Sequence, residues 1–393
     1  MKVAIVHDHF CQMGGAERVV EVMHRIFPEA PVYTTIVVRD MLWPGLRDAE
    51  IRTTWMQNLP SPRKLHRLWF PLYPRAIESL DLREYDLVLS SSSSFAKAAI
   101  VRPDARHVCY CHTPMRYAWN YDAYVARERF GPLAKRVLPP LIRRLRDWDL
   151  ATRNRPSLYV ANSSTVAARI RATYGREATI VHPPVGVQRY KPTDEPGDFH
   201  LIVSRLVAYK RIDLAIAAFS ALERPLIIVG DGSARPALEK MAGPTIRFTG
   251  RIPDYQVADY YARCRALIFP GEEDFGIAPV EANAAGRPVV AYRAGGALDS
   301  VIDGKTGVFF AEQSLTSLIA AVERCERMEW DKQALRAHAA SFSEENFVTK
   351  LRSVIQAAPT VADATRGMDK PVSASPRSPA GDRVRIRSAQ PVR

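Results

Sequence analysis

The chain has 393 residues, of which 47% are hydrophobic and 25% are charged, and its formal net charge is +13. This length predicts two or three domains, each large enough to bury its own core, and the ordinary globular composition argues against a mainly disordered chain. The positive charge suits an anionic partner, which could be nucleic acid, a phosphorylated substrate or an anionic lipid surface.

Several features of the sequence lead us to expect a cytoplasmic protein. The N-terminal run Met1–Asp8 lacks the long apolar region and the cleavage site of a secretory signal. No stretch of about 18 apolar residues occurs that could span a bilayer. The five cysteines are few and scattered, which fits a reducing compartment. Cys109, Cys111 and His112 do not have a usual zinc spacing, so no metal site is expected.

The first half of the chain, residues 1–190, alternates apolar runs with helical patterns. The run Lys2–Asp8 is almost continuously apolar, as is typical of a strand buried on both faces. After a turn, Ala16–Phe27 has the apolar spacing of an amphipathic helix. Three later runs also have a strand pattern: Asp86–Ser90, Arg106–Cys111 and Leu158–Ala161. This alternation predicts a parallel, doubly wound, Rossmann-like α/β domain.

The second half, residues 191–342, repeats this plan at closer spacing. Strands are expected at His200–Val203, Leu226–Val229, Ile246–Thr249, Ala266–Phe269 and Pro288–Tyr292. Helices are expected at Ile212–Leu222, Ala234–Met241, Asp254–Arg263 and Ala278–Ala285. The pattern predicts a second Rossmann-like domain. Pro183–Asp198, which is rich in proline and charge, is the expected linker between the two domains.

Two different segments follow the second domain. Glu344–Ile355, within residues 343–358, has one more helical pattern. In residues 359–393 few large apolar side chains remain, and Pro, Ser, Ala and Arg dominate, which predicts a disordered tail. Seven Lys and Arg against three Asp give this tail a net charge of +4. A solubilising role for the tail is favoured over contact with a membrane or with nucleic acid.

The stretch Ala266–Gly286 contains the first candidate site. A polar, glycine-containing loop follows the expected strand, at the place where open α/β sheets bind ligands. Glu273 and Glu281 flank this loop, and their carboxylates can accept hydrogen bonds from the vicinal diols of a ribose or a hexose. Taken alone, however, the two glutamates fit a solvated acidic loop better. Four N–H groups at the expected helix start can bind phosphate or sugar oxygens, namely those of Phe275, Gly276, Ile277 and Ala278.

The stretch Ser204–Arg211 contains the second candidate site, and it also lies between an expected strand and an expected helix. Arg205 and Lys210 are placed to meet a diphosphate near a helix N-terminus. Two fixed cations can stabilise the charge of a departing nucleoside diphosphate without a metal ion. A basic surface loop fits the same residues equally well.

Four motifs, which include the two candidate sites, make up the pattern: Met13-Gly-Gly-Ala-Glu-Arg-Val19, Gly230-Asp-Gly232, Ser204-Arg205-x4-Lys210 with Glu273-x7-Glu281, and Cys111-His-Thr-Pro-Met-Arg-Tyr-Ala-Trp119. In combination they resemble family 4 of the retaining glycosyltransferases, over about residues 1–357. The last motif resembles a mannosyltransferase-like branch of exopolysaccharide, lipopolysaccharide and O-antigen synthesis. The resemblance implies the GT-B fold, in which two Rossmann-like domains face a cleft.

The resemblance also implies a role for each matching residue. Arg205 and Lys210 would hold the diphosphate of a nucleotide-sugar donor, and Glu281 would bind its ribose. Glu273, together with the N–H groups of Phe275, Gly276, Ile277 and Ala278, would bind the transferred sugar. His112 would face that sugar from the first domain. Among these residues Glu273, His112, Lys210 and Arg205 would act in catalysis.

Other roles implied by the resemblance concern the edges of the site and the mechanism. Gly14 and Gly15 would let the backbone approach the phosphates or the acceptor closely, because glycine has no Cβ. Arg251 and Ile252 would contact the nucleotide base. The final helix would cross back onto the first domain, which is the acceptor side. We expect a metal-independent enzyme without a cofactor, in which Glu273 positions the sugar rather than attacking it.

The donor and acceptor are less well defined. Mannose from GDP-mannose is the expected donor, and a lipid-linked saccharide is the expected acceptor. The segment Pro62–Pro71 mixes cations with apolar side chains, and a second cluster of cations contains Lys135, Arg136, Arg143, Arg144 and Arg146. Such segments suit docking on anionic lipid headgroups, so we expect a peripheral enzyme on the inner face of the cell membrane. A packed helix with solvated charges is the alternative.

Three other classes of protein fit part of this sequence pattern. A nucleotide-sugar epimerase would share the two-domain fold, and it would turn over the donor without an acceptor. An NAD-dependent oxidoreductase would share the Rossmann pattern, but Gly14-Gly15 lacks the full dinucleotide fingerprint. A nucleic-acid-binding protein fits only the charge, since no reading motif is present, and no nucleic acid partner is expected.

Two further polar features are expected to be structural. Asp147-Trp-Asp149 matches the metal-binding D-x-D pattern of another glycosyltransferase fold. It lies within Leu141–Thr152, a helical pattern rich in arginine, so we expect these two aspartates to form surface ion pairs. His182, which precedes two prolines, is also expected to have a structural role.

Overall fold

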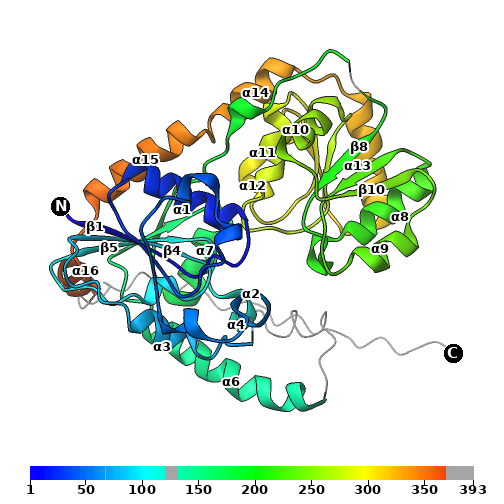
Figure 1. The fold of residues 1–393 in the computed structure, drawn as a ribbon. Coiled ribbons are helices and arrows are strands. Elements are labelled where there is room, and N and C mark those ends of the chain that lie inside the picture. The colour runs from blue at the N-terminus through cyan, green and yellow to red at the C-terminus, as the bar shows by residue number, and fades with distance from the viewer. Residues whose placement is uncertain (67, 120–131, 196, 369–393) are drawn as a thin grey trace, which may run out of the picture.

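The computed structural model describes residues 1–66, 68–119, 132–195 and 197–368. Over these residues the chain forms two α/β domains, each built on a fully parallel sheet. Figure 1 shows the two domains side by side, with the long helix α15 running from the second domain back along the first. No helix among these residues is both long and apolar enough to cross a membrane.

The first domain contains a seven-stranded sheet in the order β3-β2-β1-β4-β5-β6-β7. Its strands are β1 (Val3–His7), β2 (Val32–Thr34), β3 (Ile51–Thr53), β4 (Leu87–Ser92), β5 (Arg106–Cys111), β6 (Leu158–Ala161) and β7 (Ala178–Ile180). The central strands β1, β4 and β5 are almost entirely buried, which explains the apolar runs at Val3–Val6 and Leu87–Leu89.

The helices of the first domain cover both faces of this sheet (Figure 1). They are α1 (Gly15–Ile26), α2 (Pro62–Leu65), α3 (Tyr73–Glu78), α4 (Arg116–Trp119), α6 (Pro132–Ala151) and α7 (Ser164–Tyr174). In α1, Val19, Val20 and Met23 are buried against the sheet, as the apolar spacing predicts. The first turn of α1 lies close to the end of β1, since the carboxylate of Glu17 is 3.8 Å from the ring of His7.

The second domain has six strands in the order β10-β9-β8-β11-β12-β13. The strands are β8 (His200–Val203), β9 (Leu226–Val229), β10 (Ile246–Gly250), β11 (Leu267–Phe269), β12 (Val289–Tyr292) and β13 (Gly307–Phe310). The helices are α8 (Ile212–Leu222), α9 (Arg235–Met241), α10 (Asp254–Arg263), α11 (Ile277–Ala284), α12 (Ala297–Ser300), α13 (Leu315–Arg327) and α14 (Lys332–Ala340). Two apolar cores, one on each face of the sheet, hold this domain together.

Two chain crossings connect the domains and lie side by side. Val185 lies in the first crossing, and Phe342 begins the second. The N–H of Val185 donates to the carbonyl of Phe342 at 3.0 Å. The second crossing continues as α15 (Glu344–Ala357), whose Phe347, Leu351 and Ile355 join the core of the first domain. An ion pair between Arg18 of α1 and Glu344, at 2.5 Å, holds the start of α15 on that domain.

Four short strands were not expected from the sequence. β2, β3 and β7 have three residues each and β13 has four. β3 and β7 occupy the two edges of the first sheet, and β13 occupies one edge of the second. β3 and β7 are largely exposed, so their sequences lack the continuous apolar run that identifies a central strand. β2 and β13 are mostly buried, but they are too short to show a period.

The prediction that residues 359–393 are disordered is wrong at its start. Val361–Met368 forms the helix α16. It is attached to the first domain because the N–H groups of Val361 and Ala362 donate to the carbonyls of Ala105 and Pro103, at 2.9 and 2.8 Å. The rest of the predicted tail, residues 369–393, lies outside the described residues.

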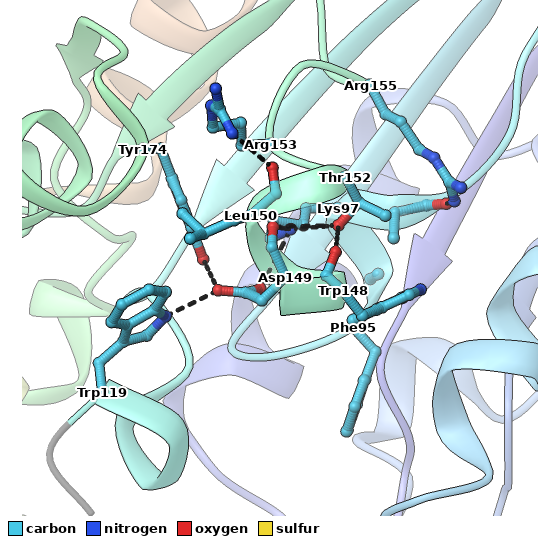
Figure 2. Close-up of polar contacts among 12 residues, drawn as sticks. Phe95, Lys97, Trp119, Trp148, Asp149, Leu150, Thr152, Arg153, Arg155 and Tyr174 are labelled. Atoms are coloured by element: carbon cyan, nitrogen blue, oxygen red, sulfur yellow. Dashed lines mark hydrogen bonds and ion pairs between the residues drawn. The ribbon is translucent and has the colours of Figure 1, made fainter. Parts of the chain in front are cut away.

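The prediction of surface ion pairs for Asp147-Trp-Asp149 is wrong for Asp149. Asp147 is exposed, but Asp149 is fully buried near the C-terminal end of α6 (Figure 2). One carboxylate oxygen of Asp149 lies 3.1 Å from the ammonium of Lys97, which is itself only 1% exposed. The other oxygen accepts hydrogen bonds from the indole of Trp119 at 2.8 Å and the hydroxyl of Tyr174 at 2.9 Å. The buried ion pair therefore fixes α6 to the domain core.

Candidate active site

The candidate site lies where the strand order reverses in each sheet. In the first sheet β1 pairs with β4, and in the second β8 pairs with β11. Loops that leave the carboxyl ends of such strands diverge to opposite faces and leave a crevice between them, where open α/β sheets bind ligands. The two sequence motifs of the second domain follow β8 and β11, so the fold brings them together at one edge.

The loop after β8 carries the two expected diphosphate cations. Arg205 is exposed, and its guanidinium lies 3.3 Å from the Oε1 atom of Gln12 in the first domain. Lys210 ends a short 3-10 helix, Ala208–Lys210, and is partly buried. Gly230 and Gly232 pack beneath this loop, where an added Cβ would lie 1.9 and 2.2 Å from backbone oxygens. No larger residue fits, so the Gly-Asp-Gly motif supports the loop.

The loop after β11 carries Glu273, and its carboxylate forms an ion pair with the ammonium of Lys210. Gly271 brings the two loops together, since a Cβ on it would lie 2.8 Å from the Cα of Lys210. Together Ser204, Lys210, Gly271 and Glu273 line a small pocket. The expected diphosphate cation and the expected sugar carboxylate are therefore direct neighbours.

The helix α11 begins at Ile277, close to the predicted start. Gly276 has a φ of +81°, and a Cβ on it would lie 2.5 Å from the ring of Phe269, so only glycine fits there. The ring of Phe275 is buried in the core. Among the described residues, the N–H groups of Phe275 and Gly276 have no hydrogen-bond acceptor. With Ile277 and Ala278 they can therefore bind an anion or a sugar oxygen at the helix start.

Glu281 lies one turn further along α11. It accepts a hydrogen bond from the hydroxyl of Tyr261 at 2.8 Å. Burial raises the pKa of this carboxyl group, while hydrogen bonds from Tyr190 and Tyr261 act in the opposite direction. A carboxylate has about four acceptor sites, so one held by two tyrosines keeps capacity for a further hydroxyl pair, as the expected ribose contact requires.

Gly14 and Gly15 lie at the start of α1, opposite α11. A Cβ on Gly15 would lie 3.1 Å from the side chain of Ile277, so these two helix starts face each other across the domain boundary. Gly14 lies over the carboxylate of Glu17, at 2.8 Å from an added Cβ. The structure thus places the glycine motif of the first domain against the start of α11 in the second.

His112 directly follows β5 and is 8% exposed. Its Nε2 lies 2.8 Å from the hydroxyl of Ser91 at the end of β4. Burial lowers the pKa of His112 to about 4, so the ring is neutral at pH 7. Among the described residues, His112 forms no hydrogen bond or ion pair with Glu273. The two loops instead meet through the ion pair of Arg116 with Asp274.

Arg116, Arg169 and Asp274 form a contact between the domains that the sequence did not identify. Asp274 pairs with Arg116 at 2.6 Å and with Arg169 at 2.5 Å. Arg169 also pairs with Glu272 at 2.7 Å. Arg116 lies within the Cys111–Trp119 motif, which is the one signal that could have identified it. The two ion pairs of Asp274 hold the loop around Glu273 against the first domain.

Asp299 makes a second contact between the domains. It accepts hydrogen bonds from the N–H of Ser164 at 2.7 Å and from His182 at 2.9 Å. His182 is thus placed at the boundary between the domains. Gly295 and Gly296 lie under the loop that carries Glu273, and they were not identified from the sequence. An added Cβ would lie 2.2 Å from the carbonyl oxygen of Glu273 at Gly295, and 2.1 Å from the Cα of Phe275 at Gly296. The two consecutive glycines shortly after β12 are the sequence signal that could have identified this close packing.

Arg251 and Ile252 lie apart from this cluster. Arg251 is exposed after β10, and Ile252 is half-buried against the core. A cavity of about 670 Å³ lies between Arg18 and Trp43 of the first domain and Asp254 and Tyr255 of α10, and neither Arg251 nor Ile252 lines it. Among the described residues, no group of three or more His, Cys, Asp or Glu side chains is arranged to hold a metal ion.

Two family models match consecutive parts of the chain. Residues 13–189 match the model described as Glycosyltransferase Family 4. Residues 188–342 match the model described as Glycosyl transferases group 1. Together the two models span both domains.

Curated relatives match over shorter segments. A D-inositol 3-phosphate glycosyltransferase of Streptomyces avermitilis is 31% identical over 38% of this chain and 39% of its own. A GDP-mannose-dependent alpha-(1-6)-phosphatidylinositol monomannoside mannosyltransferase of Mycolicibacterium smegmatis is 32% identical over 39% of this chain and 49% of its own. The chain thus spans less than half the length of each of these two relatives.

Solved structures match over almost the whole chain. HepE of Anabaena, in complex with UDP and glucose, has a TM-score of 0.67 at 19% identity and covers 91% of this chain and all of its own. The lipopolysaccharide outer core galactosyltransferase WaaB has a TM-score of 0.62 at 16% identity, and covers 91% of this chain and 99% of its own. These likenesses confirm the predicted two-domain fold.

Proposed function

Since the chain belongs to family 4 of the glycosyltransferases, with the GT-B fold, we propose that it is a retaining glycosyltransferase that uses a nucleotide-sugar donor. The ion pair between Lys210 and Glu273 is the observation that best supports this activity. It joins a cation suited to a diphosphate to a carboxylate suited to sugar hydroxyls. A nucleotide-sugar carries a diphosphate and a sugar in direct succession, so one donor can occupy both groups.

The residues suggest how the transfer proceeds. Arg205 and Lys210 stabilise the negative charge that develops on the departing nucleoside diphosphate, and the N–H groups at the start of α11 add to this effect. Glu273 holds the hydroxyls of the sugar. The acceptor attacks the anomeric carbon from the side on which the diphosphate leaves, and a diphosphate oxygen takes the acceptor proton. A trapped covalent bond between Glu273 and the sugar would contradict this route.

The identity of the donor sugar is a finer part of the proposal. The mannosyltransferase of M. smegmatis named above depends on GDP-mannose, which supports mannose from GDP-mannose as the donor. HepE was solved with UDP and glucose, so UDP-glucose is the rival donor. The relative's acceptor, a phosphatidylinositol monomannoside, supports a lipid-linked saccharide as the acceptor here. Surface polysaccharide synthesis is the process that we assign to this reaction.

The proposal also includes a peripheral position at an anionic membrane surface, on its cytoplasmic side. Arg143 and Arg144 are exposed on α6, as are Arg136 and Val137 near its start. Leu68 is 69% exposed, whereas Trp69 and Phe70 pack against the domain core. The exposed cations and Leu68 suit a surface of lipid headgroups. The side chains of Pro62, Lys64 and Lys135 lie outside the described residues.

A thermal-shift series with nucleotide-sugars and bare nucleotides, run with and without EDTA, tests the donor. A ligand that binds only the folded state raises the melting temperature. Stabilisation by GDP-mannose and GDP supports the proposal in full. Stabilisation by UDP-glucose instead keeps the enzyme class and replaces the sugar. Stabilisation by NAD alone contradicts the proposal, and a response to GDP-mannose that EDTA abolishes contradicts metal independence.

A further inference from the structure

A chain of buried polar side chains runs from His112 to the helix α1. The Nε2 of His112 lies 2.8 Å from the hydroxyl of Ser91. That hydroxyl lies 3.2 Å from the Nδ1 of His7, and the same Nδ1 lies 3.1 Å from the backbone carbonyl of Ser91. The Nε2 of His7 faces the carboxylate of Glu17 at 3.8 Å. His7, Ser91 and Glu17 are all at least 98% buried, so no bulk water competes for these contacts.

The contact with a backbone carbonyl settles where the protons lie. A carbonyl oxygen can only accept, so the Nδ1 of His7 must carry a hydrogen and donate it. A nitrogen that carries a hydrogen has no free lone pair, so the hydroxyl oxygen of Ser91 can only accept from it as well. Among the described residues, the Nε2 of His112 is the only further partner of the buried Ser91 hydroxyl. If that Nε2 also donated, the hydroxyl hydrogen would have no acceptor, so the hydroxyl donates and the Nε2 of His112 accepts.

We propose that His7 and Ser91, supported by Glu17, are positioning residues that hold His112 as the neutral tautomer with its proton on Nδ1. This inference rests on the proposed function, in which His112 faces the transferred sugar. The Nδ1 of His112 makes no hydrogen bond with another described residue. The tautomer therefore gives the site one N–H donor for a sugar oxygen, and a ring that cannot take a proton from the acceptor.

The surroundings of the chain support this arrangement. Burial lowers the pKa of His112 to about 4, which keeps the ring neutral. For His7 burial lowers the pKa, but the carboxylate of Glu17 outweighs it together with Asp8 and the Ser91 carbonyl, and the pKa is raised overall. When His7 is protonated, both of its ring nitrogens carry a hydrogen, so its Nδ1 can only donate. Asn162 also holds the loop, since its amide donates to the carbonyl of His112 at 3.0 Å.

The neighbouring serine provides a matched control. Ser90 and Ser91 are adjacent on β4, and both are fully buried. The hydroxyl of Ser90 lies 2.9 Å from the Nε2 of His107, a contact of the same kind as that of Ser91 with His112. Ser90→Ala therefore removes an equivalent buried hydrogen bond that is not connected to His112. Any effect specific to Ser91→Ala reports on His112 rather than on the loss of a hydroxyl.

Nitrogen-15 NMR of histidine-labelled protein, with His112→Gln to assign the resonance, measures the tautomer directly. We expect wild type and Ser90→Ala to show His112 protonated on Nδ1 alone, and Ser91→Ala to show a mixture of tautomers. With the donor that the thermal-shift series identifies, Ser91→Ala should lower kcat about 10-fold to 100-fold and leave KM within about 2-fold. Ser90→Ala should leave kcat unchanged. His7→Asn, which keeps an N–H donor near the position of Nδ1, should retain most of kcat.

Two results would overturn the inference. The first is a wild-type spectrum in which His112 carries its proton on Nε2. The second is an equal loss of kcat in Ser91→Ala and Ser90→Ala. The spectrum does not depend on turnover, so a protein that transfers no sugar would refute the proposed function while the tautomer is still decided.

Discussion

Glu272 and Glu273 are neighbours in the chain, but their carboxylates have different partners. Glu273 pairs with Lys210 in the candidate site, whereas Glu272 is half-exposed and pairs with Arg169. We expect Glu273→Gln to lower kcat about 100-fold, because the sugar loses a charged acceptor and Lys210 loses its partner. Steady-state transfer assays with the identified donor would measure this effect.

Glu272→Gln is the control for that prediction, because it removes a carboxylate one residue away. We expect its kcat to stay within about 3-fold of wild type, since an exposed ion pair contributes little. A larger loss of kcat in Glu272→Gln than in Glu273→Gln would show that the sugar contact belongs to Glu272 and not to Glu273.

Asp149 gives a prediction about stability. Its carboxylate is the only charged partner of the buried Lys97 ammonium among the described residues. Asp149→Asn should therefore lower the free energy of unfolding by about 3 kcal/mol, because an uncompensated charge stays in the core. Urea unfolding followed by circular dichroism would measure the change.

The exposed Asp147 is the matched control for Asp149, since both belong to the same D-x-D pattern. Asp147→Asn should change the free energy of unfolding by less than about 0.5 kcal/mol. If the two substitutions destabilise the protein equally, the buried ion pair is not what holds α6. Stabilisation of wild type by manganese that Asp147→Asn removes would restore the metal-binding interpretation of the pattern.

Some site residues could be predicted from the sequence because their partners are close in the chain or belong to one motif. Arg205 and Lys210 follow one strand, and Glu273 follows another with a fixed spacing to Glu281. Arg169 and Asp274 could not be found in this way, since the ion pair joins residues 105 positions apart in two domains. Their contact depends on how the domains pack, which no local pattern encodes.

At the scale of elements, α6 is the helix that the docking proposal depends on. Arg143 and Arg144 are exposed on it, and Ile142 and Leu145 are buried. Replacing both arginines with glutamate should weaken binding to phosphatidylglycerol vesicles about 10-fold or more at low salt, since each cation near such a surface contributes about 1 kcal/mol. Vesicle sedimentation over a range of salt concentrations would measure the binding.

The control reverses two exposed arginines on the second domain, Arg327 of α13 and Arg336 of α14. This variant has the same net charge as the α6 variant, so it should bind vesicles like wild type if α6 is the docking element. Equal weakening in both variants would indicate that net charge alone attracts the protein. Wild type that ignores the vesicles at low salt would refute docking.

The length of an element decided how well the sequence predicted it. β8, β9, β12 and α10 lie within one residue of the expected ranges or share their bounds. These elements have continuous apolar runs or a complete amphipathic pattern. The three-residue strands β2, β3 and β7 are too short to show a period, and the first turn of α16 depends on hydrogen bonds to a loop more than 250 residues earlier.

For the whole molecule, the alternation of strands and helices was sufficient to predict two parallel sheets. Parallel strands need crossover connections, and these are right-handed, which leaves few topologies for a βαβ chain. The arrangement of the domains needed the structure. It depends on pairs such as Arg116 with Asp274 and His182 with Asp299, and on the seam between Val185 and Phe342.

Buried histidines should make the stability of the whole molecule depend on pH. Burial lowers the pKa of four of them below the usual value of 6.5: to about 4 for His9 and His112, and to about 3 for His107 and His200. Each of these rings is neutral in the folded state at pH 5.5, but takes up a proton when the chain unfolds. His7 acts in the opposite direction, because its pKa is raised.

Below pH 6.5 the chain therefore takes up protons at these histidines when it unfolds. Their contribution to the free energy of unfolding falls as the pH falls from 6.5 towards 4. At pH 5.5 each neutral histidine lowers it by roughly 1.4 kcal/mol relative to pH 7.5, and the stabilisation from His7 is already present in full below pH 6.5. Urea unfolding at pH 7.5 and 5.5 would measure the difference. His200→Leu removes one titrating ring far from the candidate site, so it should reduce the difference by about the contribution of one histidine. A protein as stable at pH 5.5 as at pH 7.5 would show that these rings become protonated within the fold.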